Sequence, residues 1–375
     1  MFQHQIAETK KSIFISTGEI SGDFYAGEII KHLKEKNDVE VFALGGESVV
    51  QAGATLVSDT TAIATFGFWE LLHTLRQWKE VWKKTVKVLR SCHPKVAILI
   101  DNPGFNLRVV RLCRQIGIPV VYFIPPQVWV WNQRRAGILS RNVDWILTIF
   151  PWEENYFKSG LAKVKWVGHP VLSKISDFNP PEVNKTAKKI ILLPGSRGKE
   201  IEDFLEIFKK AFISFIDRHP DFEYVMVLAS ERYKNNVEKQ LSGLPITLKK
   251  REDLYQVLPG SSLSISCSGT ITLEVALMGI PQIIVYRLSN ITYLLARLFL
   301  KKRFIGLPNI LLEREVCPEL VQNDFNSENL LQTMEKMIND SLGKSSMQKY
   351  AKEIRKILAQ NDTYSQVVEV IENYL

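Results

Sequence analysis

The segment Ile190–Glu200, with the sequence IILLPGSRGKE, decides the fold of this chain. Its four aliphatic residues predict a buried strand, and the proline, glycine and serine after them predict a tight turn. A helical pattern begins near Ile201. A strand that turns directly into a helix is half of a βαβ unit, and a series of such units builds a parallel sheet with helices on its faces.

The same alternation runs through the rest of the chain. Strands are predicted at Ser12–Ser16, Val39–Leu44, Val96–Ile100, Val120–Ile124, Trp145–Ile149 and Lys165–Val167, and then at Ile190–Leu193, Tyr224–Leu228, Ile246–Leu248, Leu263–Ser266 and Gln282–Tyr286. Helices are predicted near Asp23–Glu35, Phe68–Arg90, Leu107–Gln115, Gln133–Leu139 and Pro151–Ser159. The sequence therefore predicts an α/β protein with two Rossmann-like halves.

A polar segment separates the two series of strands. It spans residues 173–189 and contains Asn179-Pro180-Pro181, which is typical of a linker. We expect a first domain over residues 1–172, a second over residues 190–343, and a helical tail over residues 344–375 as a candidate to cross back to the first domain. Ligands of such folds bind at the carboxyl ends of the strands, so a cleft between the domains is the predicted site.

The composition is that of a globular protein. A chain of 375 residues suits two domains, and a content of 46% hydrophobic and 23% charged residues excludes bulk disorder and a coiled coil.

The polar start, Met1–Lys11, predicts no secretory signal and hence a cytoplasmic location. Prolines interrupt the longest uncharged stretch, Gln115–Gln133, which argues against a membrane-spanning helix. The four cysteines are scattered, which indicates reduced thiols.

A formal net charge of +8 predicts an anionic partner. The segments Phe66–Arg90 and Ile291–Leu312 each carry a net +4 among large apolar residues. Such segments bind anionic lipid headgroups, although each could also be an ordinary helix that packs on a sheet. We favour peripheral attachment to the cytoplasmic surface of the inner membrane. Nucleic acid is not expected, because no nucleic-acid-binding motif is present.

Two turns in the second half are typical of phosphate binding. Each follows a strand and opens a helix, where backbone N–H groups and Arg197 suit a diphosphate. The residues concerned are Gly195, Ser196, Arg197 and Glu200 in the first turn, and Ser268, Gly269, Thr270, Thr272 and Glu274 in the second. Glu274 lies about one turn into its helix, where it can accept hydrogen bonds from ribose hydroxyls. Either turn alone could be a simple helix start, but the pair predicts a nucleoside diphosphate.

Polar residues also follow strands in the first half. Asp101 ends the strand Val96–Ile100, where it either serves as a general base in the cleft or caps a helix. Gly18–Asp23 follows the first strand without a G-x-G-x-x-G pattern, so a nicotinamide cofactor is not predicted. His169 stands at the domain junction, as a cleft residue or a structural one.

The sequence contains no Asp-x-Asp, no H-E-x-x-H and no paired histidines, so neither a metal nor a cofactor is predicted.

Taken together, these blocks resemble the lipid-A-disaccharide synthases, which are glycosyltransferases of family 19 with the two-Rossmann-domain GT-B fold. The matching blocks are Gly18-Glu19-x-Ser21-Gly22-Asp23, Gly45-Gly46, Asp101-x-Pro103-x-Phe105-Asn106, Pro126-Gln127-Val128-Trp129-x-Trp131, Val167-Gly168-His169-Pro170, Leu193–Arg197, Ser268–Glu274, Tyr286-Arg287, Leu307-Pro308-Asn309 and Pro318-Glu319-Leu320. They extend over about residues 12–335. The resemblance predicts two domains whose parallel sheets face a central cleft.

The resemblance implies a reaction and a role for several residues. It implies that 2,3-diacylglucosamine passes from UDP to 2,3-diacylglucosamine 1-phosphate, without a metal, to form the β-1,6-linked disaccharide and UDP. Asp101 would be the base for the acceptor hydroxyl, Arg197 and the Ser268–Thr270 helix start would stabilise the diphosphate, and Glu274 would hold the ribose. The residues expected on the acceptor side or in the cleft are Gly18, Glu19, Ser21, Gly22, Asp23, Asn106, Gln127, Trp129, Trp131, Arg135, His169, Arg287 and Asn309.

Three positions depart from the family pattern and leave acceptor choice open. The family often has a second acid where this chain has Gly104, and usually has Ser at Pro125 and Arg at Asn132. Other readings also remain: another UDP-sugar enzyme of GT-B type, such as a peptidoglycan N-acetylglucosaminyltransferase or a UDP-sugar epimerase, or a peripheral membrane protein without catalysis. The sequence is compatible with a homo-oligomer.

Overall fold

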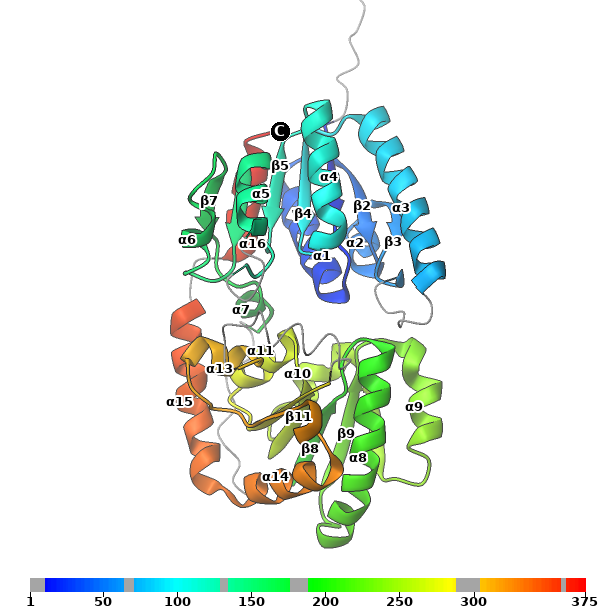
Figure 1. The fold of residues 1–375 in the computed structure, drawn as a ribbon, viewed down its shortest axis with the longest axis vertical. Coiled ribbons are helices and arrows are strands. Elements are labelled where there is room, and N and C mark those ends of the chain that lie inside the picture. Colours follow the sequence, from blue (N-terminus) through cyan, green and yellow to red (C-terminus); the bar gives the residue numbers. More distant parts are fainter. Residues whose placement is uncertain (1–10, 64–70, 129–133, 176–187, 288–303, 359–361) are drawn as a thin grey trace, which may run out of the picture. The chain divides into compact units, whose positions relative to one another are not determined.

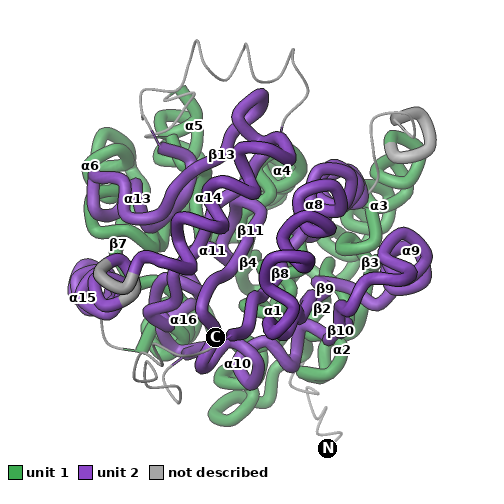
Figure 2. The backbone as a smooth tube through the Cα atoms, turned by 90° about the horizontal axis from the view of Figure 1, so that it is seen from below, with its two compact units in different colours: residues 1–170, 360–375 green, residues 171–359 purple. Residues whose placement is uncertain are grey.

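The two series of strands form two parallel sheets. The computed structural model describes residues 11–63, 71–128, 134–175, 188–287, 304–358 and 362–375 (Figure 1). The chain divides into two compact units, one of residues 1–170 with 360–375 and the other of residues 171–359 (Figure 2). The predicted α/β class, with two Rossmann-like halves, is therefore confirmed.

The sheet of unit 1 has the strand order β3-β2-β1-β4-β5-β6-β7, and all its neighbouring strands are parallel. The strands are β1 (Ser12–Ser16), β2 (Glu40–Gly45), β3 (Thr55–Asp59), β4 (Val96–Ile100), β5 (Val120–Phe123), β6 (Trp145–Thr148) and β7 (Lys163–Trp166). The sequence prediction missed β3, because this edge strand is mostly exposed and poor in large apolar residues.

Helices connect these strands. They are α1 (Ile20–Lys36), α2 (Glu47–Gln51), α3 (Leu71–Cys92), α4 (Pro103–Ile116), α5 (Arg134–Asn142) and α6 (Glu154–Phe157), and the final helix α16 (Thr363–Glu372) completes the unit. α16 packs against α1: Asn37 at the end of α1 donates to Glu372 over 2.9 Å, and the rings of His32 and Tyr364 lie 5.6 Å apart. Tertiary packing thus places residues far apart in sequence in one unit.

The sheet of unit 2 has the order β10-β9-β8-β11-β12-β13 and is also parallel. Its strands are β8 (Lys189–Leu193), β9 (Glu223–Leu228), β10 (Ile246–Lys250), β11 (Leu263–Cys267), β12 (Gln282–Tyr286) and β13 (Glu319–Val321). Its helices are α7 (Val171–Lys174), α8 (Gly198–Arg218), α9 (Lys234–Gln240), α10 (Leu254–Val257), α11 (Thr270–Leu277), α13 (Leu307–Leu312), α14 (Ser327–Asn339) and α15 (Ser341–Leu358), with short 3₁₀ turns η3 (Glu231–Tyr233), η4 (Arg251–Asp253) and η5 (Gln322–Asp324). The sequence prediction missed β13, which has three residues.

The long helix α8 carries the core of unit 2. Phe204, Phe208 and Phe212 recur every four residues, so they share one face of the helix. Their rings stack in succession, at 5.5 Å and 4.6 Å between centroids, and Phe212 meets the ring of Tyr224 on β9 at 4.3 Å. This buried stripe fixes α8 on the sheet, and with it the turn at which α8 begins.

The predicted boundary segments are only partly described. Residues 176–187 of the predicted linker lie outside the described residues; α7 ends before them and β8 begins after them. The predicted tail, residues 344–375, is divided between the units, since α15 belongs to unit 2 and α16 to unit 1.

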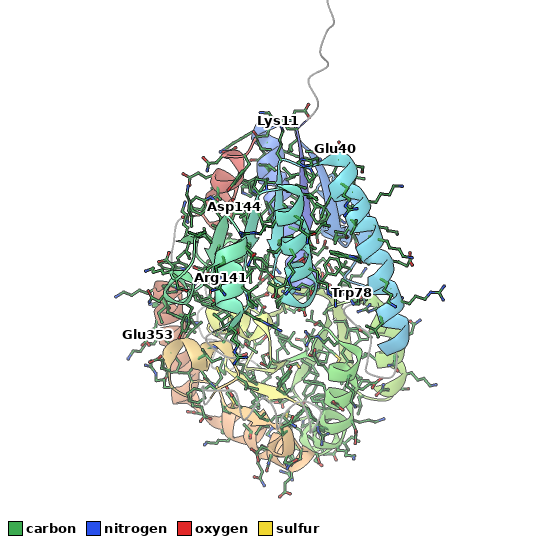
Figure 3. The ribbon with its side chains drawn as sticks, turned by 45° about the horizontal axis from the view of Figure 1, so that its top comes forward. Lys11, Glu40, Trp78, Arg141, Asp144 and Glu353 are labelled. Carbon is green, nitrogen blue, oxygen red and sulfur yellow. The ribbon has the colours of Figure 1, made fainter. Side chains whose placement is uncertain are left out.

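Helix α3 belongs to one of the two predicted membrane segments. Trp78, labelled in Figure 3, and Trp82 pack against Phe105 of α4, with ring centroids 5.0 Å and 6.0 Å apart. These two tryptophans therefore pack against the core of unit 1. Exposed basic residues occupy other positions of α3, namely Arg76, Lys79, Lys83, Lys84, Lys87 and Arg90. Residues 64–70 and 288–303 of the two segments lie outside the described residues.

No helix in the described part of the chain combines the length and the apolar character needed to cross a bilayer.

Candidate active site

The turn between β8 and α8 is built around Glu200. The Glu200 carboxylate accepts hydrogen bonds from the backbone N–H groups of Ser196 and Arg197, each over 3.3 Å, and its Oε1 lies 3.2 Å from Nη1 of Arg197. Gly195 has φ +103°, and a Cβ there would lie 2.7 Å from Oε2 of Glu200. Glu200 therefore fills the helix start with its own negative charge. A carboxylate at a helix start opposes the binding of a diphosphate there, so the structure gives Glu200 a role in shaping the turn, and its contact with a nucleotide stays a prediction.

The turn between β11 and α11 lies beside the first turn. β8 and β11 are neighbours, with Leu193 opposite Ser266, so their carboxyl ends meet at one sheet edge. Gly269 is exposed, has φ +151° and provides no side-chain cap for α11, which leaves the first N–H groups of that helix without a side-chain acceptor at its N-cap. Such a helix start attracts an anion. Ser268 and Thr270 are half-buried at the same turn.

Thr272 does not belong to this exposed group. It is fully buried, and its hydroxyl donates to the carbonyl of Gly269 over 2.8 Å. Thr272 thus shapes the turn, and its contact with the nucleotide stays a prediction.

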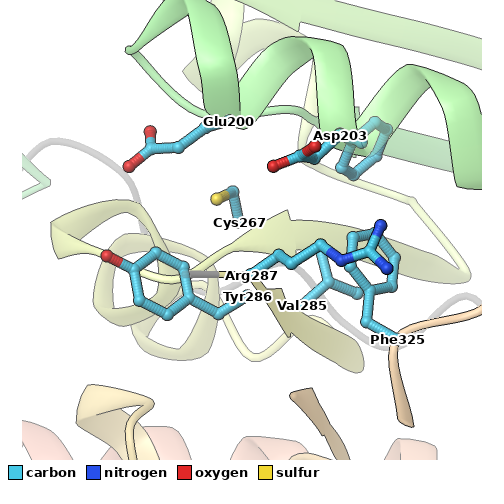
Figure 4. Close-up of a pocket in the computed structure, with 8 residues that line it drawn as sticks. Glu200, Asp203, Cys267, Val285, Tyr286, Arg287 and Phe325 are labelled. Atoms are coloured by element: carbon cyan, nitrogen blue, oxygen red, sulfur yellow. The ribbon is translucent and has the colours of Figure 1, made fainter. Parts of the chain in front are cut away.

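A small pocket adjoins both turns. Figure 4 shows it, with seven of its lining residues labelled. The lining consists of Glu200, Asp203, Phe204, Cys267, Val285, Tyr286, Arg287 and Phe325. Arg287 is exposed. Burial raises the pKa of the Cys267 thiol, as does the nearby charge of Glu200, so this cysteine is a poor nucleophile.

Glu274 is buried in an ion-pair cluster. It is 3% exposed, and Nη2 of Arg251 donates to both of its oxygens, over 2.8 Å to Oε1 and 2.6 Å to Oε2. The Tyr255 hydroxyl donates to Oε2, and Nζ of Lys174 lies 3.9 Å from Oε1. Burial alone raises the pKa of Glu274, but the charges of Arg251 and Lys174 and the Tyr255 hydrogen bond outweigh it and hold the pKa below its usual range. The carboxylate is therefore ionised and firmly held.

Sequence reasoning missed the partners of Glu274. Arg251 follows β10 directly and so lies at the carboxyl edge of the sheet, where a basic residue could have been noticed. Tyr255 and Lys174 offered no such pattern, because they come from the short helices α10 and α7.

In unit 1, Asp101 occupies a constrained position at the end of β4. Asp101 and Asn102 both have positive φ, +47° and +44°, a conformation that costs free energy and is concentrated at functional sites. The Asp101 carbonyl accepts from the Tyr122 hydroxyl over 2.6 Å and from Nδ2 of Asn106 over 2.8 Å. These two bonds fix the backbone that carries the half-buried Asp101 side chain.

Asn106 holds the backbone of Asp101. Its side chain is fully buried, with Oδ1 accepting from the Ser16 hydroxyl over 2.6 Å and Nδ2 also donating to the Ile100 carbonyl over 3.2 Å. These bonds give Asn106 a positioning role, and its predicted place on the acceptor side stays a prediction.

The loop after β1 adjoins Asp101, since β1 and β4 are paired neighbours. This loop leads into α1, and Asp23 in the first turn of α1 is buried and accepts from the backbone N–H groups of Gly46, Ser48 and Val49 over 2.6, 2.9 and 3.4 Å. Asp23 thus joins the start of α1 to the start of α2, and its predicted acceptor contact stays a prediction.

The glycines of this loop are needed for packing. A Cβ on Gly18 would lie 2.2 Å from the Asn102 amide, and one on Gly22 would lie 2.1 Å from the Thr17 hydroxyl. Of the five residues predicted between Gly18 and Asp23, only Glu19 and Ser21 are partly exposed.

The remaining predicted residues of unit 1 differ in exposure. Gln127 is exposed and Arg135 is half-buried, while Trp129 and Trp131 lie outside the described residues. His169 is buried, with its ring 5.3 Å from that of Phe150, so it is not an open ligand group.

Asn309 is saturated within unit 2. It is fully buried, its Oδ1 accepts from the N–H groups of Val316 and Cys317, and its Nδ2 donates to the Cys317 carbonyl and to Glu319. Asn309 therefore stabilises the fold, and its predicted cleft contact stays a prediction. Among the described residues, no group of three or more metal-ligating side chains comes together.

The fold and the two phosphate-type turns define the class as a GT-B type protein. Two solved structures share the fold. UDP-GlcNAc 2-epimerase from Neisseria meningitidis bound to UDP-GlcNAc has a TM-score of 0.64 and 12% identity, with coverage of 96% of this chain and 100% of that one. Acinetobacter baumannii MurG has a TM-score of 0.57 and 15% identity, with coverage of 97% of this chain and 99% of that one. A family model described as lipid-A-disaccharide synthetase matches residues 13–370. The chain belongs to that family, which confirms the resemblance.

Named relatives agree with this assignment. The lipid-A-disaccharide synthase of Sulfurihydrogenibium sp. (strain YO3AOP1) is 32% identical over 97% of this chain and 98% of the relative. That of Nitrosococcus oceani is 31% identical over 90% and 89%.

Proposed function

We propose that this chain is an inverting glycosyltransferase that forms the lipid A disaccharide. It moves 2,3-diacylglucosamine from UDP to 2,3-diacylglucosamine 1-phosphate and releases UDP. The observation that carries the proposal is the backbone of Asp101, which two hydrogen bonds to its carbonyl fix at the carboxyl end of β4, in a chain that matches the family model over residues 13–370.

Asp101 acts as the general base. It takes the proton from the acceptor's 6-hydroxyl as that oxygen bonds to C1 of the donor sugar and the bond from C1 to the diphosphate breaks. Attack from the face opposite the leaving group turns an α-linked donor into a β-linked product. The strained and hydrogen-bonded backbone at Asp101 supports this role, because a base must be held in reach of its proton.

Unit 2 stabilises the leaving group. The uncapped start of α11 and the guanidinium of Arg197 place positive charge where the diphosphate leaves, with no metal ion assigned. Arg197 is paired with Glu200 in the structure, so binding of the diphosphate competes with that contact.

Attachment to the inner membrane's cytoplasmic surface is part of the proposal. The exposed basic residues of α3 and the half-exposed Leu75, at 51%, support binding to anionic headgroups. Co-sedimentation with anionic vesicles should weaken with salt, and the double variant Lys83→Glu with Lys84→Glu should bind less. Equal binding to neutral vesicles would remove this part of the proposal.

The reaction is tested by incubating the purified chain with UDP-2,3-diacylglucosamine and 2,3-diacylglucosamine 1-phosphate. UDP and the disaccharide 1-phosphate should appear together, and Asp101→Ala should abolish both while UDP still binds. Conversion of UDP-GlcNAc without an acceptor would favour the epimerase alternative. Binding of UDP without any turnover would favour a protein that lacks catalysis.

A further inference from the structure

The buried cluster around Glu274 needs an explanation beyond packing. Glu274 is the sole charged residue of α11, and its helical neighbours Leu273, Val275, Ala276 and Leu277 are all buried and apolar. Burying a carboxylate with its partners costs several kcal/mol in desolvation, and well-packed apolar residues often replace such a pair without loss of stability. Stability alone therefore does not account for a charge at this place.

The cluster lies at the sheet edge that carries the phosphate-type turns. Arg251 begins η4 directly after β10, and Glu274 is the fifth residue of α11, which starts directly after the β11 turn. Residues four apart share a helix face, so Glu274 lies below Thr270, about 6 Å along the axis. A diphosphate at the start of α11 would bring its ribose to about this distance.

The carboxylate has capacity left for a ligand. A carboxylate offers about four acceptor positions. Among the described residues, Arg251 takes one position on each oxygen and Tyr255 takes a second on Oε2. One position on Oε1 remains, on the side where Lys174 approaches to 3.9 Å.

We propose that Arg251 and Tyr255 are positioning residues of the nucleoside subsite: they fix the Glu274 carboxylate so that Oε1 accepts a hydrogen bond from a ribose hydroxyl of UDP. This inference rests on the proposed function, because it takes UDP as the nucleotide. It adds two residues that the family blocks do not contain. The geometry of both is set by tertiary contacts, since their loops follow a different strand from the one that leads to α11.

The arrangement has a chemical reason. The ring of Tyr255 lies under the guanidinium of Arg251, 5.7 Å from its carbon to the ring centroid, so the two side chains hold each other as well as Glu274. Their combined donors keep the carboxylate charged in a buried place, and a charged acceptor binds a hydroxyl about twice as strongly as a neutral one.

The test compares two nucleotides on the full chain. UDP and 2′,3′-dideoxy-UDP differ only in the ribose hydroxyls, so the ratio of their dissociation constants, measured by calorimetry, reports the contact with Glu274. The wild type should prefer UDP by about tenfold or more, the effect of one hydrogen bond to a charged group. Tyr255→Phe should lower that preference several-fold and leave the affinity for dideoxy-UDP unchanged.

Arg251→Met is the stronger variant and should abolish most of the preference. If it unfolds, Tyr255→Phe decides the matter, since it removes one hydroxyl and keeps the ring. Matched controls come from Arg232 and Tyr233, which form a similar stacked pair at 4.7 Å on η3, the 3₁₀ turn that follows β9 of the same unit. Arg232→Met and Tyr233→Phe should keep the full preference for UDP.

The outcomes separate this inference from the proposed function. A wild type that binds both nucleotides equally overturns the ribose contact but leaves UDP as a ligand. An undiminished preference in Tyr255→Phe and in a folded Arg251→Met overturns the positioning role. A wild type that binds neither nucleotide overturns the UDP site and this inference together.

Discussion

Replacing Asn106 with alanine should separate the positioning of Asp101 from the binding of substrates. The change removes the acceptor of the buried Ser16 hydroxyl and one donor to each of the Ile100 and Asp101 carbonyls. An unsatisfied buried polar group costs about 1–3 kcal/mol, and the Asp101 carbonyl keeps the Tyr122 hydroxyl. We therefore expect the free energy of unfolding to fall by about 3 kcal/mol, measured by urea titration.

Catalysis should fall by more than stability explains. A displacement of about 1 Å in a catalytic group can cost a factor of about 100, so kcat of Asn106→Ala should drop roughly tenfold to a hundredfold. The KM for the UDP-sugar should stay near the wild-type value, because the proposed donor residues belong to unit 2. The assay follows UDP release at saturating acceptor, at a temperature where the variant is folded.

Two further variants serve as controls for this experiment. Asn37→Ala also loses two side-chain hydrogen bonds in unit 1, to Leu33 and Glu372, but has no link to Asp101, so its kcat should be unchanged. Tyr122→Phe removes one bond to the Asp101 carbonyl and should reduce kcat less than Asn106→Ala. A folded Asn106→Ala with kcat within about threefold of wild type would refute the positioning of Asp101 by this network.

Other outcomes follow from unit 2. Glu200→Gln removes the internal negative charge from the start of α8 and should tighten UDP binding about threefold in calorimetry. Glu202→Gln, on the exposed side of the same helix, should leave UDP binding unchanged. Weaker UDP binding in Glu200→Gln would show that the carboxylate assists the nucleotide. Gly195→Ala should destabilise the protein in thermal melts, since φ is +103° and the new methyl group would press on Glu200; an unchanged melting temperature would contradict this. The pKa of Glu274 lies below its ordinary value of 4.5, so the unfolded state takes up the proton first as the pH falls, and stability present above about pH 4.5 should be lost below it. Glu274→Gln should flatten this part of the plot of unfolding free energy against pH. An identical plot for the variant would exclude the Arg251 pairing as the cause of the loss.

Much of the fold could be predicted because each strand carries its own pattern. Segments such as Val96–Ile100 and Leu263–Ser266 are buried on both faces in a parallel sheet, so they are continuously apolar and easily recognised. The edge strands β3 and β13 were missed for the opposite reason: they are partly exposed and lack a long apolar run, and their pairing with a neighbour defines them. The sequence suggested that the tail could cross back to the first domain, but it did not show where the tail divides, because packing of α16 on α1 decides that.

The candidate site was predicted less well, residue by residue. The motif positions are all polar or small, and the sequence does not distinguish a residue that contacts a ligand from one that supports the turn. Asp23, Asn106 and Asn309 share the chemistry of ligand residues, yet each is buried and its hydrogen bonds go to the protein. Arg251 attracted no attention, because its partner Glu274 lies 23 residues away.

The sequence by itself determined the alternation of strands and helices, the two phosphate-type turns and the family, because local patterns and short motifs are written in consecutive residues. Only the tertiary structure decided which side chains carry out which task. Burial and hydrogen-bond saturation depend on residues brought together from distant segments, as when Ser16, Tyr122 and Asn106 meet around the end of β4 to hold Asp101, or when η4 and α10 close on Glu274.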